Sequence, residues 1–298
     1  MKAKVILFNC VMILYLAGNR AAHGQVFLSG TNYTQNFNAI SNGLPPGWSV
    51  RTNATETSLG AATAFNRTNT SWSTGTGQFC NAAGITSNSL GMATGYESTT
   101  VQAAFTNRCL GIRQTAAFGD PGAAFVFQIA NTAGCSNLVF HLDLNLLRTN
   151  GYSTTWSIDY AVGNAPAGFT TLGTYSDPGI FGTTNESFAL GNDADDQTNN
   201  VWIRVVALQA ATGSGSRDTF GIDNFVLNYA TTNMKTPGSA IPLRIQIDGQ
   251  NAMLIWTDAT FALQAAPTPA GVFTNVTGAA SPFTHARVAP ATFYRLIR

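Results

Sequence analysis

Charge is scarce in this sequence, and its two signs nearly balance. Of the 298 residues only 10% are charged, and the formal net charge is +1 at pH 7. So little positive charge gives no basic field for nucleic acid and no polybasic patch for anionic lipid. The composition therefore argues against nucleic acid as a partner.

Side chains that commonly carry catalysis are few as well. The three glutamates, Glu56, Glu97 and Glu186, lie in separate polar segments without the paired spacing that a glycosidase needs. The sequence has no Gly-x-Ser-x-Gly elbow, and its histidines form no zinc-binding pattern with cysteine. We therefore expect a non-catalytic protein, with a glycoside-active enzyme as the weaker alternative.

Cysteine is rare: the chain has four, and Cys10 falls in an N-terminal segment that we expect to be removed. The remaining three, Cys80, Cys109 and Cys135, cannot all pair with one another in an oxidising compartment. We expect a disulfide between Cys80 and Cys109, because Cys135 follows a turn-like segment. Three unpaired, buried thiols are the alternative.

Long apolar runs are missing, except for one at the N-terminus. Lys2 and Lys4 precede an apolar stretch over residues 5–16, and small residues stand before Gln25. This order is typical of a signal peptide over residues 1–24. The stretch is shorter than the roughly 20 residues that a spanning helix needs. We therefore expect a secreted, extracellular or cell-surface protein with no membrane span once the signal is removed.

What the sequence does contain is a strand pattern with a period of two. In residues 138–147 and again in residues 156–162, every second residue is large and apolar. Such alternation predicts strands that bury one side, and no window shows a good helical period. The fold class is therefore all-β, with its main sheet around residues 107–163.

The composition also divides the chain into two domains. Residues 231–239 are polar, contain Pro237-Gly238 and have no apolar period, so they are expected to be a linker. This gives a first domain over residues 25–230 and a small second domain over residues 240–298, where several short apolar runs predict further strands.

Several motifs carry a resemblance to a known class of module. They are Phe37-Asn38, the Leu-Pro-Pro-Gly-Trp run at 44–48, Cys-Leu-Gly-Ile-Arg-Gln-Thr at 109–115 and Gly-Ile-Asp-Asn-Phe at 221–225. Together they resemble the jelly-roll modules of secreted bacterial surface proteins, which have a concanavalin-like or carbohydrate-binding-module-like shape. The tail, with residues 263–265, 271–276 and 293–296, is similar to a fibronectin-III-like module.

The resemblance implies a jelly-roll β-sandwich followed by a small fibronectin-III-like β-sandwich. It also implies a binding, adhesive or accessory role, with polysaccharide or a cell-surface glycan as the expected partner. A structural or adhesive extracellular protein with no small ligand is the alternative.

Polar side chains on the predicted strands offer a site for such a ligand. The candidates are His141, Asp143, Asn145, Asp159, Trp202 and Arg204. If they face the same way, they form a groove in which sugar hydroxyls bond to polar groups and a sugar ring stacks on the indole. Trp202 is available because residues 201, 203, 205 and 207 form the purely apolar side of its strand. The alternative is a solvated sheet face on which Arg204 pairs with Asp143 or Asp159.

Acidic residues near the end of the first domain could hold a structural calcium ion. Asp193, Asp195 and Asp196 lie in one loop, and Asp223 stands in the last strand. The loop lacks the glycine and the distal glutamate of the helical calcium motif, so a solvated loop is the favoured interpretation.

Overall fold

A computed structural model describes residues 25–86, 97–231, 243–248, 251–268, 272–286 and 292–297. The chain divides into two compact units, Met1–Thr232 and Asn233–Arg298. The predicted signal peptide lies outside the described residues. So does the predicted linker, apart from Thr231, which is the last residue of a strand.

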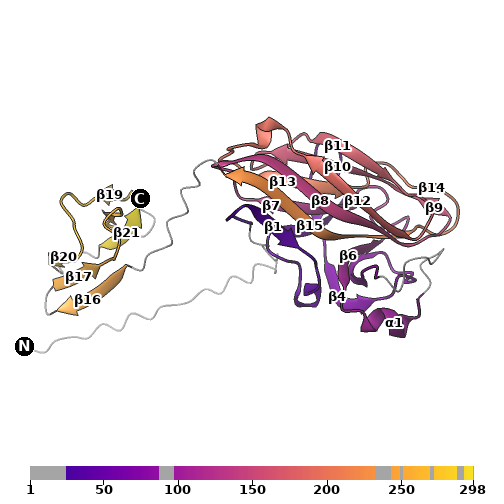
Figure 1. Cartoon of the computed structure of the whole chain (residues 1–298), viewed down its shortest axis with the longest axis horizontal. Helices are drawn as coiled ribbons and strands as arrows, with labels where there is room; N and C mark the ends of the chain where they lie inside the picture. Colours follow the sequence, from indigo (N-terminus) through magenta and orange to yellow (C-terminus); the bar gives the residue numbers. More distant parts are fainter. Residues whose placement is uncertain are drawn as a thin grey trace, which may run out of the picture. The chain divides into compact units, whose positions relative to one another are not determined.

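The first unit is a sandwich of two mainly antiparallel sheets (Figure 1). One, called here the β8 sheet, has the order β12 (Gly182–Ala189), β8 (Cys135–Arg148), β15 (Thr219–Thr231), β6 (Arg108–Arg113), β5 (Gln78–Ala83) and β4 (Phe65–Thr70), with β1 (Asn32–Gln35) also paired to β15. The other, the β13 sheet, has the order β11 (Thr170–Ser176), β10 (Thr155–Val162), β13 (Val201–Val206), β7 (Ala124–Ile129), β2 (Trp48–Thr52) and β3 (Ala61–Ala62).

Strands that follow one another in sequence mostly cross between the sheets, since β7, β8, β10, β12, β13 and β15 alternate between them. This is the connectivity of a jelly roll, and the all-β fold class is confirmed. A short pair, β9 (Tyr152–Ser153) and β14 (Thr212–Gly213), stands apart from both sheets.

Helix is limited to short pieces in the described residues: α1 (Thr99–Ala104) and the 3-10 turns η1 (Ile40–Asn42) and η2 (Asn192–Ala194). The Ser98 hydroxyl caps α1 by accepting a hydrogen bond from the Val101 amide. The sequence had no helical period long enough to predict this single turn and a half. No helix among these described segments is long and apolar enough to cross a membrane.

Aromatic rings fill the space between the sheets. Trp156 of β10 stacks on Phe220 of β15 with ring centroids 4.5 Å apart, and Phe125 of β7 meets Phe79 of β5 at 5.3 Å. The alternating apolar residues of β8 also point into this core: Leu138, Phe140, Leu142, Leu144 and Leu146 are each at most 2% exposed. The predicted inward face of this strand is therefore confirmed.

Both sheets carry a second buried layer on their outer faces. Outside the β8 sheet, Trp72 and Phe181 cover Cys80, Cys109 and a neighbouring leucine. Outside the β13 sheet, a cluster forms around Trp202. The outer faces are thus partly covered by connecting segments, and this covering decides which of the predicted site residues can be reached.

In the described residues of the second unit there are two small three-stranded sheets. They are β16 (Arg244–Asp248), β17 (Asn251–Ile255) and β20 (Phe283–Ala286), and β19 (Thr274–Asn275), β18 (Ala262–Ala266) and β21 (Phe293–Ile297). Leu254, Trp256 and Leu263 form its buried centre. Its likeness to a fibronectin-III module stays a prediction.

Candidate functional site

The six predicted ligand residues do not lie in one groove. His141, Asp143 and Asn145 belong to β8, whereas Asp159 lies on β10 and Trp202 and Arg204 on β13, in the other sheet. All six point away from the core between the sheets, so the two groups stand on opposite outer faces. Alternation showed which way each side chain points, but it could not show that consecutive strands belong to different sheets.

Arg204 is buried, which corrects its interpretation as a groove residue. Its Nε and Nη2 donate to the two carboxylate oxygens of Asp159 at 2.8 and 2.7 Å. Its Nη1 donates to the carbonyls of Thr55 at 3.1 Å and Ser58 at 2.8 Å, and its Cζ lies 3.3 Å from the centroid of the Phe169 ring. Arg204 thus joins β10 to the segment between β2 and β3.

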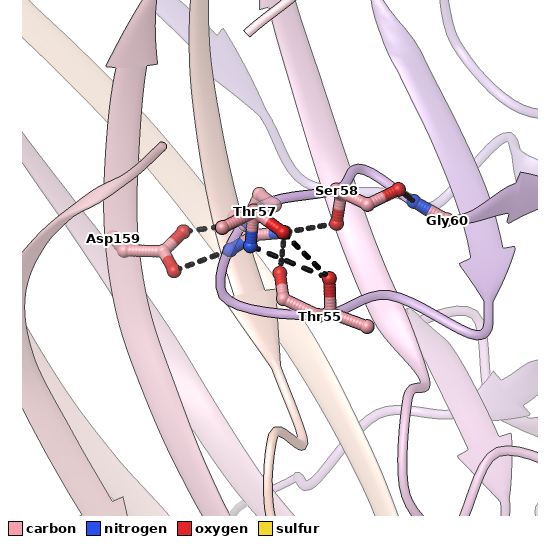
Figure 2. A network of polar contacts seen from close by, with 6 residues as sticks. Thr55, Thr57, Ser58, Gly60 and Asp159 are labelled. Atoms are coloured by element: carbon pink, nitrogen blue, oxygen red, sulfur yellow. Dashed lines mark hydrogen bonds and ion pairs between the residues drawn. The ribbon is translucent and has the colours of Figure 1, made fainter. Parts of the chain in front are cut away.

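That segment, residues 53–60, is called the cover loop. Figure 2 shows Asp159 on one side of the network and Thr55 and Ser58 of the loop on the other. Gly60 ends the loop at φ 77°, where an added Cβ would lie 2.4 Å from the Thr52 carbonyl oxygen. Burial raises the pKa of Asp159, and the hydrogen bonds and charge of Arg204 oppose that rise. Of the alternative prediction, the pairing of Arg204 with Asp159 is therefore found, but the solvated sheet face is wrong, because both side chains are buried.

Trp202 is also covered, at 5% exposure. Its ring packs in a cluster with Ala54 and Leu59 of the cover loop and with Val126, and its Nε1 donates to the Gly163 carbonyl at 2.7 Å. An indole held this way offers no stacking platform to a sugar.

The β8 residues have a different setting, because part of their outer face is open. Asp143 accepts hydrogen bonds from two exposed amides, Asn185 Nδ2 at 2.5 Å and Asn224 Nδ2 at 2.8 Å. These three side chains come from β12, β8 and β15 and are called the polar row. His141 is exposed on the same strand face as Asp143.

A cavity of about 240 Å³ lies beside the polar row, between β1 and β15. It is lined by Thr34, Gln35, Asn36, Asn224, Phe225 and Val226. The ladder between β15 and β8 shifts register between Asp223 and Val226, and Asn224 sits there at φ 45°. A bulge of this kind turns a side chain outward, and asparagine tolerates the left-handed conformation well.

Two buried polar residues lie next to the polar row, on the strands β8 and β15. Asn145 is 2% exposed and accepts a hydrogen bond from the Thr183 hydroxyl at 2.7 Å, so this candidate is not open to a ligand. Asp223 is 1% exposed and faces Asp143 across the ladder. Burial raises the pKa of Asp223 to about 7, and the charge of Asp143 adds to the rise, while the Asn224 amide opposes it.

The four candidate calcium ligands do not gather at one point. Tyr160 Oη donates to Asp193 at 2.5 Å, and the Gly134 amide donates to Asp196 at 2.7 Å. In the described part of the chain, no three acidic, histidine or cysteine side chains are placed to hold a metal ion together. The loop carboxylates Asp193 and Asp196 instead tie the η2 loop to neighbouring segments, and Asp223 accepts a hydrogen bond from the Asn224 amide at 2.8 Å.

The predicted disulfide is absent: Cys80, Cys109 and Cys135 are buried free thiols. In the β5–β6 ladder, Cys80 is paired with Gly111 and Cys109 with Ala82. The two cysteines are diagonal neighbours, for which the Cα separation of roughly 7–8 Å exceeds the usual disulfide range. Burial raises the pKa of Cys80 to about 12 and that of Cys109 well above its usual value, so both stay protonated.

Sequence reasoning missed most of the residues around the open site. Asn185 and Asn224 are ordinary asparagines in a sequence rich in that residue, and neither carries a spacing signal. Asn224 could have been noticed as a polar residue that interrupts the alternation after Asp223. Its contact with Asp143 depends on strand pairing, which the pattern does not give.

Comparison with known proteins finds similarity in solved structures alone. No protein family matches the sequence, and no curated protein matches it. The K1 cleaved adhesin domain of Lys-gingipain from Porphyromonas gingivalis W83 aligns with a TM-score of 0.35 and 14% identity, over 67% of this chain and 98% of that domain. The C-terminal family 22 carbohydrate-binding module of xylanase 10B from Clostridium thermocellum aligns with a TM-score of 0.35 and 12% identity, over 69% of this chain and 98% of the module.

A third solved structure is the enzymatically active domain of tailspike protein 4 from bacteriophage CBA120. It has a TM-score of 0.32 and 12% identity, over 62% of this chain and 19% of that one. Similarities at this level do not assign a function, which has to be inferred from the residues themselves.

Proposed function

We propose that this protein is a secreted, non-catalytic binding module that binds a polysaccharide or cell-surface glycan at the polar row and at the cavity beside it. One observation carries the proposal. The Asp143 carboxylate is held on both sides by the exposed amides of Asn185 and Asn224, beside a cavity that Asn224 also lines.

The chemistry of the polar row suits sugar hydroxyls. Each of the two asparagines uses one N–H on Asp143 and keeps a second N–H and its carbonyl oxygen for a ligand. Because Asp143 fixes both amides, their rotamers are set before a ligand arrives, and less conformational entropy is lost on binding.

The size and charge of the site narrow the ligand class. A cavity of about 240 Å³ lies below the roughly 300–1,000 Å³ of pockets that enclose a drug-sized ligand. It therefore fits one ring of a longer chain, with the half-buried Val226 offering apolar contact to the C–H groups. The negative charge of Asp143 disfavours uronic acids, so the ligand is a neutral glycan.

The test is a glycan array probed with the secreted full chain, followed by titration of the best neutral polysaccharide. Asn185→Ala removes an exposed amide of the row, and Asn224→Gly does so while keeping the left-handed backbone. Each is expected to weaken binding roughly threefold to tenfold, the worth of one hydrogen bond.

Asn228→Ala is the matched control, because Asn228 is an exposed asparagine of the same strand outside the polar row. It should bind as the parent does. The proposal fails if the parent binds no neutral glycan, in which case a structural or adhesive role without a small ligand becomes the better account. It also fails if Asn228→Ala weakens binding as much as the row variants.

Export and a fibronectin-III-like C-terminal unit complete the proposed function. The charged and apolar order of residues 1–24 supports export with removal of that segment. Intact-mass measurement of the secreted protein should give a chain that begins at Gln25, and a product that retains Met1 would contradict it.

A further inference from the structure

A second, smaller cavity lies between the two sheets at one end of the sandwich. It measures about 10 Å³, close to the space for one water-sized particle. Its floor includes Trp156 and Phe220, and its polar lining includes Gln114, Tyr175, Asp177 and Asp218. It is called the end cavity, and none of its residues takes part in the proposed glycan site.

Two carboxyl groups meet in the end cavity. Asp177 follows β11 and Asp218 precedes β15, so chain segments from both sheets contribute. Asp218 is 7% exposed, and Asp177 lies within hydrogen-bonding reach of it. Burial, followed by the hydrogen bond and the charge of Asp177, raises the pKa of Asp218 to about 8, while the Asn150 amide and Arg113 oppose the rise.

Tyr175 supplies an independent sign that the end cavity has an occupant. The residue is 5% exposed, and its hydroxyl is buried without a hydrogen-bond partner. Burial raises the pKa of this hydroxyl to about 12; Thr184 lies near enough to oppose the rise, but the two groups do not meet in hydrogen-bonding geometry. A buried polar group of this kind normally has a partner, which can be a water or an ion.

Two arginines near the cavity form contacts with other groups, although Arg113 Nε is buried without a hydrogen-bond partner. Arg217 Nε forms an ion pair with Asp120 at 2.5 Å. Arg113 Nη1 donates to the Arg217 carbonyl and to the Thr219 hydroxyl. Arg148 adds positive charge near Arg113. Positive charge is thus present nearby, but its effect on Asp218 is smaller than that of burial and of Asp177.

We propose that the end cavity binds one calcium ion, with Asp177 and Asp218 as its two anionic ligands. Calcium takes carboxylate, amide and hydroxyl oxygens, and the cavity lining offers the Gln114 carbonyl oxygen and the Thr154 hydroxyl beside the two acids. Magnesium is disfavoured because it keeps several waters, for which the cavity has no room. The ion joins the segment before β15 to the segment after β11.

The experiment uses terbium as a luminescent substitute for calcium, with the chelator-treated full chain. Trp156 lines the cavity, so excitation of tryptophan should sensitise a bound terbium ion, and calcium should compete for the site. Asp218→Asn and Asp177→Asn preserve side-chain shape and remove a ligand charge. Each is expected to weaken terbium binding by at least about tenfold.

Asp195→Asn is the matched control, since Asp195 belongs to the acidic loop at η2 and not to the end cavity. This variant should bind terbium as the parent does. An equal loss in Asp195→Asn would assign the ion to that loop and overturn the proposal. An absence of sensitised emission from the parent would overturn it as well.

Discussion

Asp159 and Arg204 face each other across the β10–β13 ladder and form a bidentate ion pair that is buried from solvent. Arg204 Nε lies 2.8 Å from Asp159 Oδ1, and Arg204 Nη2 lies 2.7 Å from Asp159 Oδ2. Both side chains point out of the sandwich, so the pair is buried because the cover loop folds over it. The loop is held in turn by the same guanidinium, through the carbonyls of Thr55 and Ser58. Pair and loop therefore depend on each other.

The first prediction concerns this dependence. Arg204→Met leaves the Asp159 carboxylate buried without its partner and removes the donors to the cover loop. Loss of one partner of a buried ion pair costs about 3–5 kcal/mol in the free energy of unfolding. Urea denaturation should show this loss, and amide hydrogen exchange should speed up in residues 54–60.

Arg51→Met is the control for this experiment. Arg51 also donates to the cover loop, to the Gly60 carbonyl at 3.0 Å, but it is half-buried and has no carboxylate partner in this network. Loss of this hydrogen bond in Arg51→Met should lower the free energy of unfolding by about 1 kcal/mol. Equal effects of the two substitutions would show that the ion pair is not what holds the loop.

The second prediction is that Trp202 contributes stability and no ligand contact. Trp202→Ala should lower the free energy of unfolding by about 3–5 kcal/mol, as expected for loss of a large buried ring. Trp202→Phe should lower the free energy of unfolding by less, since it keeps a large ring and loses mainly the hydrogen bond to the Gly163 carbonyl. Glycan binding by the folded variants should match the parent. Weaker glycan binding at unchanged stability would instead restore the indole as a binding platform.

The third prediction is a pH dependence set by Asp218. Its pKa rises from 3.8 to about 8 on folding, so the folded chain holds a proton that the unfolded chain gives up. The stabilising contribution is complete below pH 3.8 and is lost as the pH rises through about 8. Asp218→Asn imitates the protonated form and should therefore gain stability over the parent as the pH is raised.

Denaturation in the presence of a chelator at pH 5, 7 and 9 measures this difference without interference from calcium. The stability of the variant relative to the parent should rise from pH 5 to pH 7 and should be greatest at pH 9. Asp195→Asn should show no such trend. A constant difference between Asp218→Asn and the parent at all three pH values would contradict the raised pKa of Asp218.

The fourth prediction concerns the two units. The polar residues 231–239 predict a linker, and exposed polar linkers are preferred sites of proteolysis. Limited proteolysis should therefore leave a folded fragment that ends near residue 231. A first cut within residues 107–163 would contradict this division.

The sequence predicted the inward faces of the main strands well, because alternation responds directly to burial on one side. Phe140 and Leu144 of β8 and Trp156 and Ile158 of β10 are all buried as the pattern indicates. The resemblance to jelly-roll modules gave the fold class correctly. These features depend on local sequence, so no knowledge of strand pairing was needed.

The candidate site depends on long-range pairing, and there the sequence was less informative. His141 and Asp159 lie on β8 and β10, which are separated in sequence only by the two-residue β9, yet β8 and β10 belong to different sheets. Arg204 and Trp202 lie on the outer side of β13, as the alternation indicates, but a period of two does not reveal what covers that side. Asp177 directly follows β11 and Asp218 directly precedes β15. These two residues are 41 positions apart in sequence (218 − 177), and only the topology brings them together.

The cover loop has a consequence for protein engineering. Connections between strands on a sandwich surface are usually the first choice for inserting a peptide, a tag or a new chain terminus, because such segments tolerate changes in length. Residues 53–60 look suitable in sequence, since they are polar and rich in threonine. Their carbonyls, however, are fastened to a buried guanidinium. An insertion at Thr55 or Ser58 would therefore open the outer layer of the β13 sheet, so grafted segments should be placed in other connections.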